Sequence, residues 1–307
     1  KRARTLPRVW ESLKKQTFRD FEWLVIDDGS TDGTEELVAG YLREAPFPIR
    51  YIKQANQHKK VAFNRAVKEA RGELVLYLDS DDGCVPEALE RLWWHWQNIP
   101  ADQRQGFSAI TVLCKDEDGN IIGDRFPGGE WVDSTSSEIT HRWKVRGEKW
   151  GFHRTDVLRQ FPFPEDVRGY VPECYVWMQV DHQYRTRFVN EPLRLYYRDQ
   201  DDSLMTTGAK DPRPSADGGL LGSAVELREC IRWFRYDARQ LCKLAANMVR
   251  LALHSTLPRE RIRRAMWTDQ PLAARLLLLA VAPVGLAVYC LDRWRLRATA
   301  RKGTPGC

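Results

Sequence analysis

Several common structural signals are missing from this chain of 307 residues. Its seven cysteines include no Cys-x-x-Cys pair, which excludes a zinc ribbon or a thioredoxin-like redox motif. Their odd number and wide spacing favour reduced thiols in a cytosolic setting. No segment repeats at solenoid spacing, so a repeat architecture is excluded. With 43% hydrophobic and 29% charged residues, the chain is neither disordered nor collagen-like, and we expect a globular fold.

Basic and acidic residues are unevenly distributed along the chain. Residues 228–307 contain 16 Lys and Arg against 5 Asp and Glu, whereas residues 1–227 contain 32 against 37. The acidic first part argues against a nucleic-acid-binding core and is compatible with a metal site, so we expect no nucleic acid as partner. The basic last part predicts an anionic partner, most simply a membrane surface.

Apolar runs and helical patterns alternate through the first hundred residues. Strands are predicted at residues 21–26, 49–52 and 73–78, and helices at 34–43, at 60–70 and from Pro86 onward. Asp32 and Glu35 have the spacing of a capping box before the first of these helices. Alternating strands and helices predict an α/β fold with a mainly parallel sheet.

The chain is predicted to have three parts. An α/β domain covers residues 1–200, a polar linker or mobile loop covers 201–219, and a basic helical extension covers 220–307. Basic residues from Arg228 to Lys243 recur at helical spacing, which suits an anionic membrane surface or a solvated helix face. The apolar segment 272–291 is at the short end for a membrane-spanning helix of ~17–25 residues. We prefer an interfacial or re-entrant placement to a span or a buried soluble helix.

Two acidic clusters follow predicted strands. They are Asp27-Asp28 and Asp79-Ser80-Asp81-Asp82. In open α/β sheets, ligands collect at the carboxyl ends of the strands. Carboxylates there suit Mg²⁺ or Mn²⁺ bridging a diphosphate, although either cluster alone would also suit residues that cap the next helix. Because two clusters stand at successive strand ends, we favour a ligand site.

Four segments in order resemble a known family. Residues 25–34 read Val-Ile-Asp-Asp-Gly-Ser-Thr-Asp-Gly-Thr, residues 62–66 read Ala-Phe-Asn-Arg-Ala, residues 70–73 read Ala-Arg-Gly-Glu, and residues 78–82 read Leu-Asp-Ser-Asp-Asp. Together they strongly resemble family 2 glycosyltransferases with the GT-A fold, and the last looks like that family's Asp-x-Asp motif. The resemblance covers roughly residues 1–200. It implies a Rossmann-like, mainly parallel sheet with helices on both faces. The family has a strand before the point where this chain starts, so we interpret the sequence as an N-terminally truncated fragment.

The resemblance also implies roles for individual residues. Asp28 is expected at the nucleotide base, Asp79 near the ribose and the metal, and Asp81 on the metal that binds the diphosphate. Basic residues near the start of the helix at 60–70 are expected to face the nucleotide or phosphates, or else to form a solvated helix face: Lys59, Lys60 and Arg65.

The catalytic base is assigned by the same resemblance. Glu173, in Pro-Glu-Cys-Tyr-Val-Trp, stands where many members have the Asp of a Glu-Asp pair, and it is our candidate. Gln179 stands where Arg is usual. Asp166 is a rival because it belongs to a literal Glu-Asp pair, whereas Asp181 is too far from the motif. Glu173 could alternatively be only a favourable charge at a helix start.

The expected function is transfer of a sugar from a nucleotide-diphosphate donor to a hydroxyl group of a glycan or lipid-linked acceptor. We expect an inverting reaction with Mg²⁺ or Mn²⁺, in surface polysaccharide or glycolipid synthesis at the cytoplasmic face of a membrane. One alternative is a nucleotidyltransferase, against which the absence of a Gly-rich, Lys-containing loop before residue 60 counts. The other is a non-catalytic, membrane-associated module that binds nucleotide or glycan.

Overall fold

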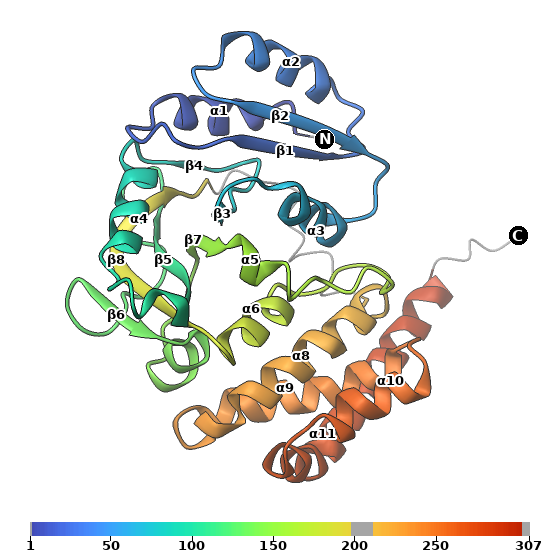
Figure 1. The fold of residues 1–307 in the computed structure, drawn as a ribbon. Helices are drawn as coiled ribbons and strands as arrows, with labels where there is room; N and C mark the ends of the chain where they lie inside the picture. Colours follow the sequence, from blue (N-terminus) through green and yellow to red (C-terminus); the bar gives the residue numbers. More distant parts are fainter. Residues whose placement is uncertain (1, 198–210, 303–307) are drawn as a thin grey trace, which may run out of the picture. The chain divides into compact units, whose positions relative to one another are not determined.

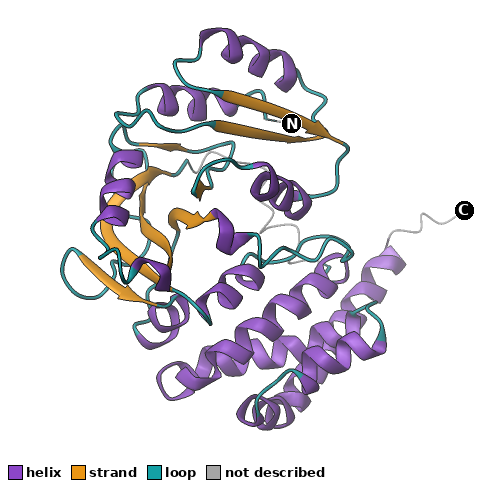
Figure 2. Cartoon of the chain, in the orientation of Figure 1, coloured by secondary structure: helices purple, strands orange, loops and turns teal. Residues whose placement is uncertain are grey.

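The computed structural model describes residues 2–197 and 211–302 (Figure 1). The chain divides into a first unit, Lys1–Phe163 with Val180–Gln200, and a second unit, Pro164–Gln179 with Asp201–Cys307. All strands of the described residues belong to the first unit, and the second unit is helical (Figure 2). Residues 164–179 therefore belong to the helical unit, although the predicted α/β domain extends to residue 200.

The first unit alternates helices and strands as predicted. In chain order its elements are α1 (Leu6–Lys14), β1 (Trp23–Asp28), α2 (Thr34–Glu44), β2 (Ile49–Gln54), α3 (Lys59–Glu69), β3 (Leu74–Leu76), β4 (Gly83–Cys84), α4 (Ala88–Gln97), η1 (Arg104–Gly106), β5 (Phe107–Lys115), β6 (Trp131–Ser134), η2 (Glu138–Arg142), β7 (Lys149–Arg154), α5 (Thr155–Leu158) and β8 (Arg185–Leu195). The last of these strands, β8, is continuous from Arg185 to Leu195.

The strands form two sheets. β1 and β2 are a parallel pair, from Trp23 opposite Ile49 to Asp28 opposite Gln54. The other six strands follow the order β3-β7-β5-β8-β4, with β6 paired to β8. β5 and β8 are parallel, whereas the remaining pairs of this sheet are antiparallel. The predicted α/β class is confirmed, and the larger sheet is mixed because β7 runs antiparallel between β3 and β5.

Helix α1 holds the start of α4 in place. Its apolar face is buried, and Trp10 stacks on Tyr41 with ring centroids 4.5 Å apart. Just after the helix, the buried amide of Gln16 donates to the carbonyl oxygen of Val85 at 2.8 Å and accepts from the backbone N–H of Leu89 at 3.0 Å. Because both the N–H group and the oxygen of this buried amide are hydrogen-bonded, the amide fixes the backbone that follows the acidic loop at residues 79–82.

The capping box predicted for α2 is wrong. Gly33, with φ of 78°, occupies the N-cap, and no side chain caps the helix. One carboxylate oxygen of Asp32 accepts from the Thr34 hydroxyl at 2.6 Å, and the other accepts from the backbone N–H of Ala3 at 3.1 Å. The helix starts at Thr34 as expected, but its N-cap is Gly33 in a left-handed backbone, and Asp32 tethers the N-terminal segment instead.

The second unit is a set of packed helices. Its elements are α6 (Cys174–Asp181), which enters the first unit at its end, then η3 (Arg213–Ser215), α8 (Ala216–Cys230), η4 (Ile231–Trp233), α9 (Phe234–His254), α10 (Arg259–Arg263), η5 (Arg264–Thr268) and α11 (Leu272–Lys302). Helix α8 starts inside the linker predicted over 201–219, so that end of the linker is wrong. A Cβ at Gly218 would lie 2.0 Å from the carbonyl oxygen of Tyr170, which shows how closely this turn is packed. Residues 201–210 lie outside the described residues.

The basic stripe predicted from Arg228 to Lys243 is not one helix. The turn η4 separates α8 from α9, and Asp237 has non-helical φ and ψ of −138° and 43°. The apolar positions of α9 are nevertheless buried, because Leu241 and Ala245 are fully covered.

Helix α11 contains the apolar segment predicted at 272–291. Residues Leu272–Arg297 are long and apolar enough to cross a membrane, with a mean hydropathy of 2.1, and 22% of their best 18-residue window is buried. One face packs on α9, where a Cβ at Gly285 would lie 2.6 Å from the carbonyl oxygen of Ala246. On that face Asp292 is buried and pairs with Arg250 at 2.5 Å and with His254 at 3.2 Å.

Candidate functional site

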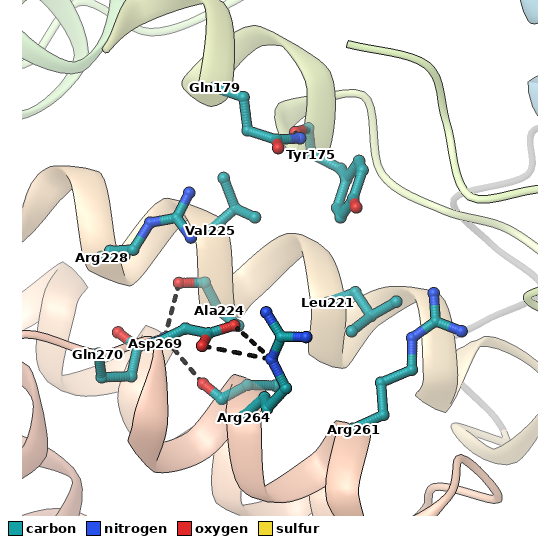
Figure 3. Close-up of a pocket in the computed structure, with 11 residues that line it drawn as sticks. Tyr175, Gln179, Leu221, Ala224, Val225, Arg228, Arg261, Arg264, Asp269 and Gln270 are labelled. Atoms are coloured by element: carbon teal, nitrogen blue, oxygen red, sulfur yellow. Dashed lines mark hydrogen bonds and ion pairs between the residues drawn. The ribbon is translucent and has the colours of Figure 1, made fainter.

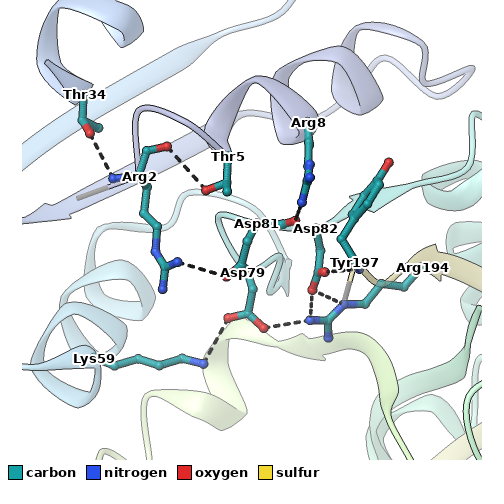
Figure 4. Close-up of polar contacts among 10 residues, drawn as sticks. All are labelled: Arg2, Thr5, Arg8, Thr34, Lys59, Asp79, Asp81, Asp82, Arg194 and Tyr197. Atoms are coloured by element: carbon teal, nitrogen blue, oxygen red, sulfur yellow. Dashed lines mark hydrogen bonds and ion pairs between the residues drawn. The ribbon is translucent and has the colours of Figure 1, made fainter. Parts of the chain in front are cut away.

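A network of charges surrounds the acidic loop between β3 and β4 (Figure 4). Arg194 of β8 contacts two of its carboxylates: its Nη2 lies 2.8 Å from Asp79 Oδ2, and its Nε lies 2.9 Å from Asp82 Oδ2. Lys59, the first residue of α3, places its Nζ 3.1 Å from Asp79 Oδ1. Arg194 and Asp82 are 6% and 2% exposed, so this pair is fixed in the interior.

The two carboxyl groups differ in ionisation. Burial would raise the pKa of Asp79, but the charges of Lys59 and Arg194 outweigh it and lower that pKa below its ordinary value. For Asp82, burial dominates and raises the pKa although Arg194 opposes the shift. Asp82 also accepts the backbone N–H of Tyr197 at 3.1 Å. Asp82 therefore anchors Arg194 and β8, whereas Asp79 carries an accessible charge.

Asp81 contacts the N-terminal segment of the first unit. Its Oδ2 lies 3.2 Å from Nη1 of Arg2, and its side chain is 20% exposed. Arg8 of α1 donates to the backbone carbonyl of Asp81 at 3.4 Å. The carboxylate is thus held in a cationic setting that also suits an anionic ligand bridged by a metal.

Asp28 lies at the end of β1 and belongs to a second network. Its Oδ1 accepts from the side-chain amide of Gln54 at 2.8 Å and from the backbone N–H of Gln57 at 2.9 Å. Gln54 in turn accepts from Arg65 of α3 at 3.2 Å, so Arg65 is linked to Asp28 through one side chain. A Cβ at Gly29 would lie 2.9 Å from the backbone nitrogen of Asn56, so only glycine allows this close approach.

The neighbouring Asp27 is structural. It is 4% exposed and accepts the backbone N–H of Ser30 at 2.7 Å and the hydroxyl of Tyr51. Although burial raises the pKa of Asp27, these hydrogen bonds lower it overall. Lys60 is also buried, at 6% exposure, so a solvated helix face is the wrong description for it. Lys59 and Arg65 lie beside Asp79 and Gln54.

The carboxylates of Asp79 and Asp81 fit part of the coordination shell of a divalent metal ion. Among residues 2–197 and 211–302, no three His, Cys, Asp or Glu side chains gather closely enough to hold a metal by themselves. Asp79 and Asp81 still supply hard oxygen atoms two residues apart, the ligand type that Mg²⁺ and Mn²⁺ prefer. Such a cation would take its other ligands from diphosphate oxygens and water, as Mg²⁺ commonly does.

The three candidate bases lie in different surroundings. Glu173 is half-buried in the second unit, directly before α6, and its carbonyl oxygen accepts the N–H of Trp177 at 3.2 Å. Asp166 is 69% exposed and pairs with Arg261 at 2.5 Å. Asp181 is buried in the first unit and accepts two backbone N–H groups at 2.6 Å, a structural arrangement that agrees with its distance from the motif.

Sequence reasoning missed Arg194 and Gln54. Arg194 stands in the otherwise apolar and aromatic run 192–197, and an arginine at a strand position of that kind is a signal for a buried ion pair. Its partner Asp82 lies 112 residues away, so the contact itself is not visible in the sequence.

Comparison with known proteins supports the resemblance. Residues 1–130 match the family model described as Glycosyl transferase family 2. YibD of Escherichia coli, an uncharacterized glycosyltransferase, is 32% identical over 61% of this chain and 56% of its own length. The GalNAc(5)-diNAcBac-PP-undecaprenol beta-1,3-glucosyltransferase of Campylobacter jejuni is 26% identical over 80% of this chain and 79% of its own length.

The S. aureus TarS 1–349 complex with UDP-GlcNAc has a TM-score of 0.62 at 18% identity, covering 94% of this chain and 88% of that chain, which confirms the GT-A fold. The chain spans about half the length of YibD.

Proposed function

Because residues 1–130 belong to glycosyl transferase family 2, we propose that this chain transfers a sugar from a nucleoside diphosphate donor to an acceptor hydroxyl group. The observation that carries the proposal is the network of Asp79, Asp81, Lys59 and Arg194 beside the strand ends. It combines fixed carboxylates with cations in the place where open α/β sheets bind ligands. The structural neighbour that binds UDP-GlcNAc supports a nucleotide-sugar donor, and the relative named for a lipid-linked glycan supports an acceptor of that class.

The donor site that we propose uses residues of the first unit. Asp28, held by Gln54 and the backbone of Gln57, accepts hydrogen bonds from the nucleotide base, and Asp79 lies near the ribose. Lys59 and Arg65 supply positive charge for the diphosphate. The side-chain pairs of Asp28 and Asp79 hold these groups in place before the donor binds, which reduces the ordering cost of binding.

A divalent cation, Mg²⁺ or Mn²⁺, would be held by Asp81 with Asp79. When bound, it would supply positive charge that stabilises the diphosphate leaving group. Asp79 stays ionised because Lys59 and Arg194 lower its pKa, and an ionised carboxylate is what a hard cation requires.

Chemistry at the acceptor is assigned to Glu173. Its carboxylate accepts the proton of the acceptor hydroxyl as that oxygen forms a bond to the anomeric carbon and the bond from that carbon to the diphosphate oxygen breaks. A single displacement of this kind inverts the anomeric configuration. Asp166 is less suited because its carboxylate is already engaged in an ion pair with Arg261.

The second unit, we propose, rests on the cytoplasmic face of an anionic membrane where a lipid-linked or surface glycan is extended. Helix α11 exposes large apolar residues on the face away from α9: Leu272, Leu276, Leu279, Leu286 and Trp294 are 50–70% exposed. Arg293, Arg295 and Arg297 follow the apolar stretch and complement anionic lipid. The buried pair of Asp292 with Arg250 ties α11 to α9, which favours a helix lying in the interface.

Nucleotide binding tests the donor site. Thermal unfolding of this chain is measured with UDP, GDP, dTDP and CDP, each with and without Mn²⁺. One nucleotide at 100 times its Kd is expected to stabilise by about 2.7 kcal/mol, and the gain should disappear in Asp81→Asn. Glu11→Gln, which removes an exposed carboxylate of α1, is the matched control. No stabilisation by any nucleotide would overturn the donor site, and turnover of a nucleoside triphosphate to pyrophosphate would favour a nucleotidyltransferase.

Flotation with lipid vesicles tests the membrane proposal. The chain is expected to float with vesicles containing anionic lipid and much less with purely zwitterionic vesicles. Replacing both Leu276 and Leu279 by Ser should abolish flotation because it removes exposed apolar area from α11. Leu42→Ser changes a leucine of similar exposure, 47%, in the first unit and should have no effect. Equal flotation of both variants would refute the placement.

A further inference from the structure

The second unit contains a pocket that the donor site does not use. Its volume is about 310 Å³, and it lies between α6, α8 and the segment from α10 to the start of α11 (Figure 3). Three arginines line it: Arg228 of α8, Arg261 of α10 and Arg264 of η5. Because they come from three separate segments, their convergence is a product of the tertiary fold.

Two of these arginines keep donor capacity for a ligand, whereas Arg261 is bound to Asp166 through both of its Nη groups. Arg228 uses its Nε on Glu229 at 2.7 Å, and Arg264 holds Asp269 only at 3.4 Å, also through Nε. A guanidinium group has five N–H donors, so these bonds leave both Nη groups of each side chain for other acceptors. Planar, multidentate donors of this kind recognise phosphate oxygens well.

A buried amide completes the pocket. Gln270 is 3% exposed, and its Nε2 donates to the carbonyl oxygens of Ala224 at 2.9 Å and Ala265 at 2.8 Å. These two bonds fix the amide orientation. Its Oε1 has no hydrogen-bond partner among the described residues. This oxygen has almost no accessible surface, so Gln270 fixes the wall of the pocket through its two bonds to Ala224 and Ala265 and is closed to a ligand.

The pocket also adjoins the helix of the proposed base. Tyr175 and Gln179 of α6 line it, and Tyr175 follows Glu173 by two residues. The pocket therefore combines guanidinium donors for an anion with side chains of α6. Such donors fit the phosphoryl group of an acceptor.

We propose that this pocket binds the phosphoryl group of a glycosyl phosphate acceptor, with its anionic oxygens on Arg228 and Arg264. The inference rests on the proposed function, since it names the class of acceptor. The same chemistry occurs in a soluble glycosyl phosphate and in a glycosyl diphosphate attached to a lipid.

Calorimetric titration with glucose 1-phosphate, in EDTA, tests the pocket directly. Arg228→Gln and Arg264→Gln should each weaken binding roughly tenfold or more, as expected for loss of hydrogen bonds to a charged group. Arg259→Gln removes the same charge from an exposed position of α10 outside the pocket and should bind like the parent chain. The parent chain should bind methyl glucoside, which lacks the phosphate, far more weakly than glucose 1-phosphate.

A second titration uses a polyprenyl diphosphate sugar in detergent. Weaker binding of this probe alone in the pocket variants assigns the pocket to a lipid headgroup, and weaker binding of both probes assigns it to the phosphoryl group itself. Equal affinity of parent and pocket variants for both probes, or no binding of either probe by the parent, overturns the proposal. Stabilisation by a nucleotide with Mn²⁺ should persist in both pocket variants, which separates failure of the pocket from failure of the donor site.

Discussion

Replacing Arg194 by Met tests how the acidic loop is held. Arg194 is 6% exposed and its guanidinium contacts Asp79 at 2.8 Å and Asp82 at 2.9 Å. Methionine keeps much of the side-chain volume but leaves Asp82, which is 2% exposed, without its cation. Removing one partner of a buried ion pair costs about 3–5 kcal/mol. In a unit of this size each kcal/mol lowers Tm by ~2–4 °C, so we expect Tm of the first unit to fall by roughly 6–20 °C.

Double-mutant analysis identifies the cause. Unfolding is followed by tryptophan fluorescence in Arg194→Met, in Asp82→Asn and in the variant with both changes. The double variant should be more stable than Arg194→Met because it no longer buries an unpaired charge. If Arg194→Met unfolds at the parent Tm, or if Asp82→Asn gives no recovery, the buried pair does not stabilise the loop as described.

The destabilisation should also depend on pH in a defined direction. Burial raises the pKa of Asp82, so its ionised form is the costly one, and losing Arg194 raises that pKa further. The cost is therefore fully present above the raised pKa, declines as pH falls below it and vanishes near the ordinary value of 3.8. The pKa of Asp79 is lowered, so its contribution exists above the ordinary value of 3.8 and is lost on acidification. Both effects make the loss in Arg194→Met largest near neutral pH and smallest below about pH 4.

Three further changes have defined outcomes. Gly29→Ala should cost about 1–2 kcal/mol in denaturant unfolding, because φ is +81° and a Cβ would lie 2.9 Å from the nitrogen of Asn56; an unchanged midpoint would contradict this packing. Glu191 of β8 pairs with Arg91 of α4 at 2.6 Å and with His95 at 2.8 Å, and although burial raises the pKa of Glu191, these partners lower it to about 2. Glu191→Gln should therefore lose about 1–3 kcal/mol at pH 7 and also lose the fall in stability between about pH 4.5 and 2; a parental pH profile would refute the pairing. Gly285→Val should cost about 1–3 kcal/mol because a Cβ would meet α9 at 2.6 Å, and full stability in a melting experiment would show that the two helices do not pack as described.

The local sequence pattern predicts much of the fold. The strand at 21–26 and the helix at 34–43 appear as β1 and α2, because apolar periodicity reports directly which residues must be buried. The same pattern placed Asp28 and Asp79 at strand ends, where the structure has them. It failed for the cap of α2, because Gly33 in a left-handed backbone, and not Asp32, occupies the N-cap.

Contacts between distant segments were decided only by the tertiary structure. The sequence determined the α/β class, the carboxylates after the strands and the apolar helix near the C-terminus, since each depends on neighbours along the chain. It could not reveal that Arg194 neutralises Asp79 and Asp82, or that Arg228 and Arg264 converge on one pocket. Those pairs are separated by tens of residues, and their closeness follows from how strands pair and helices pack, which local propensity does not encode.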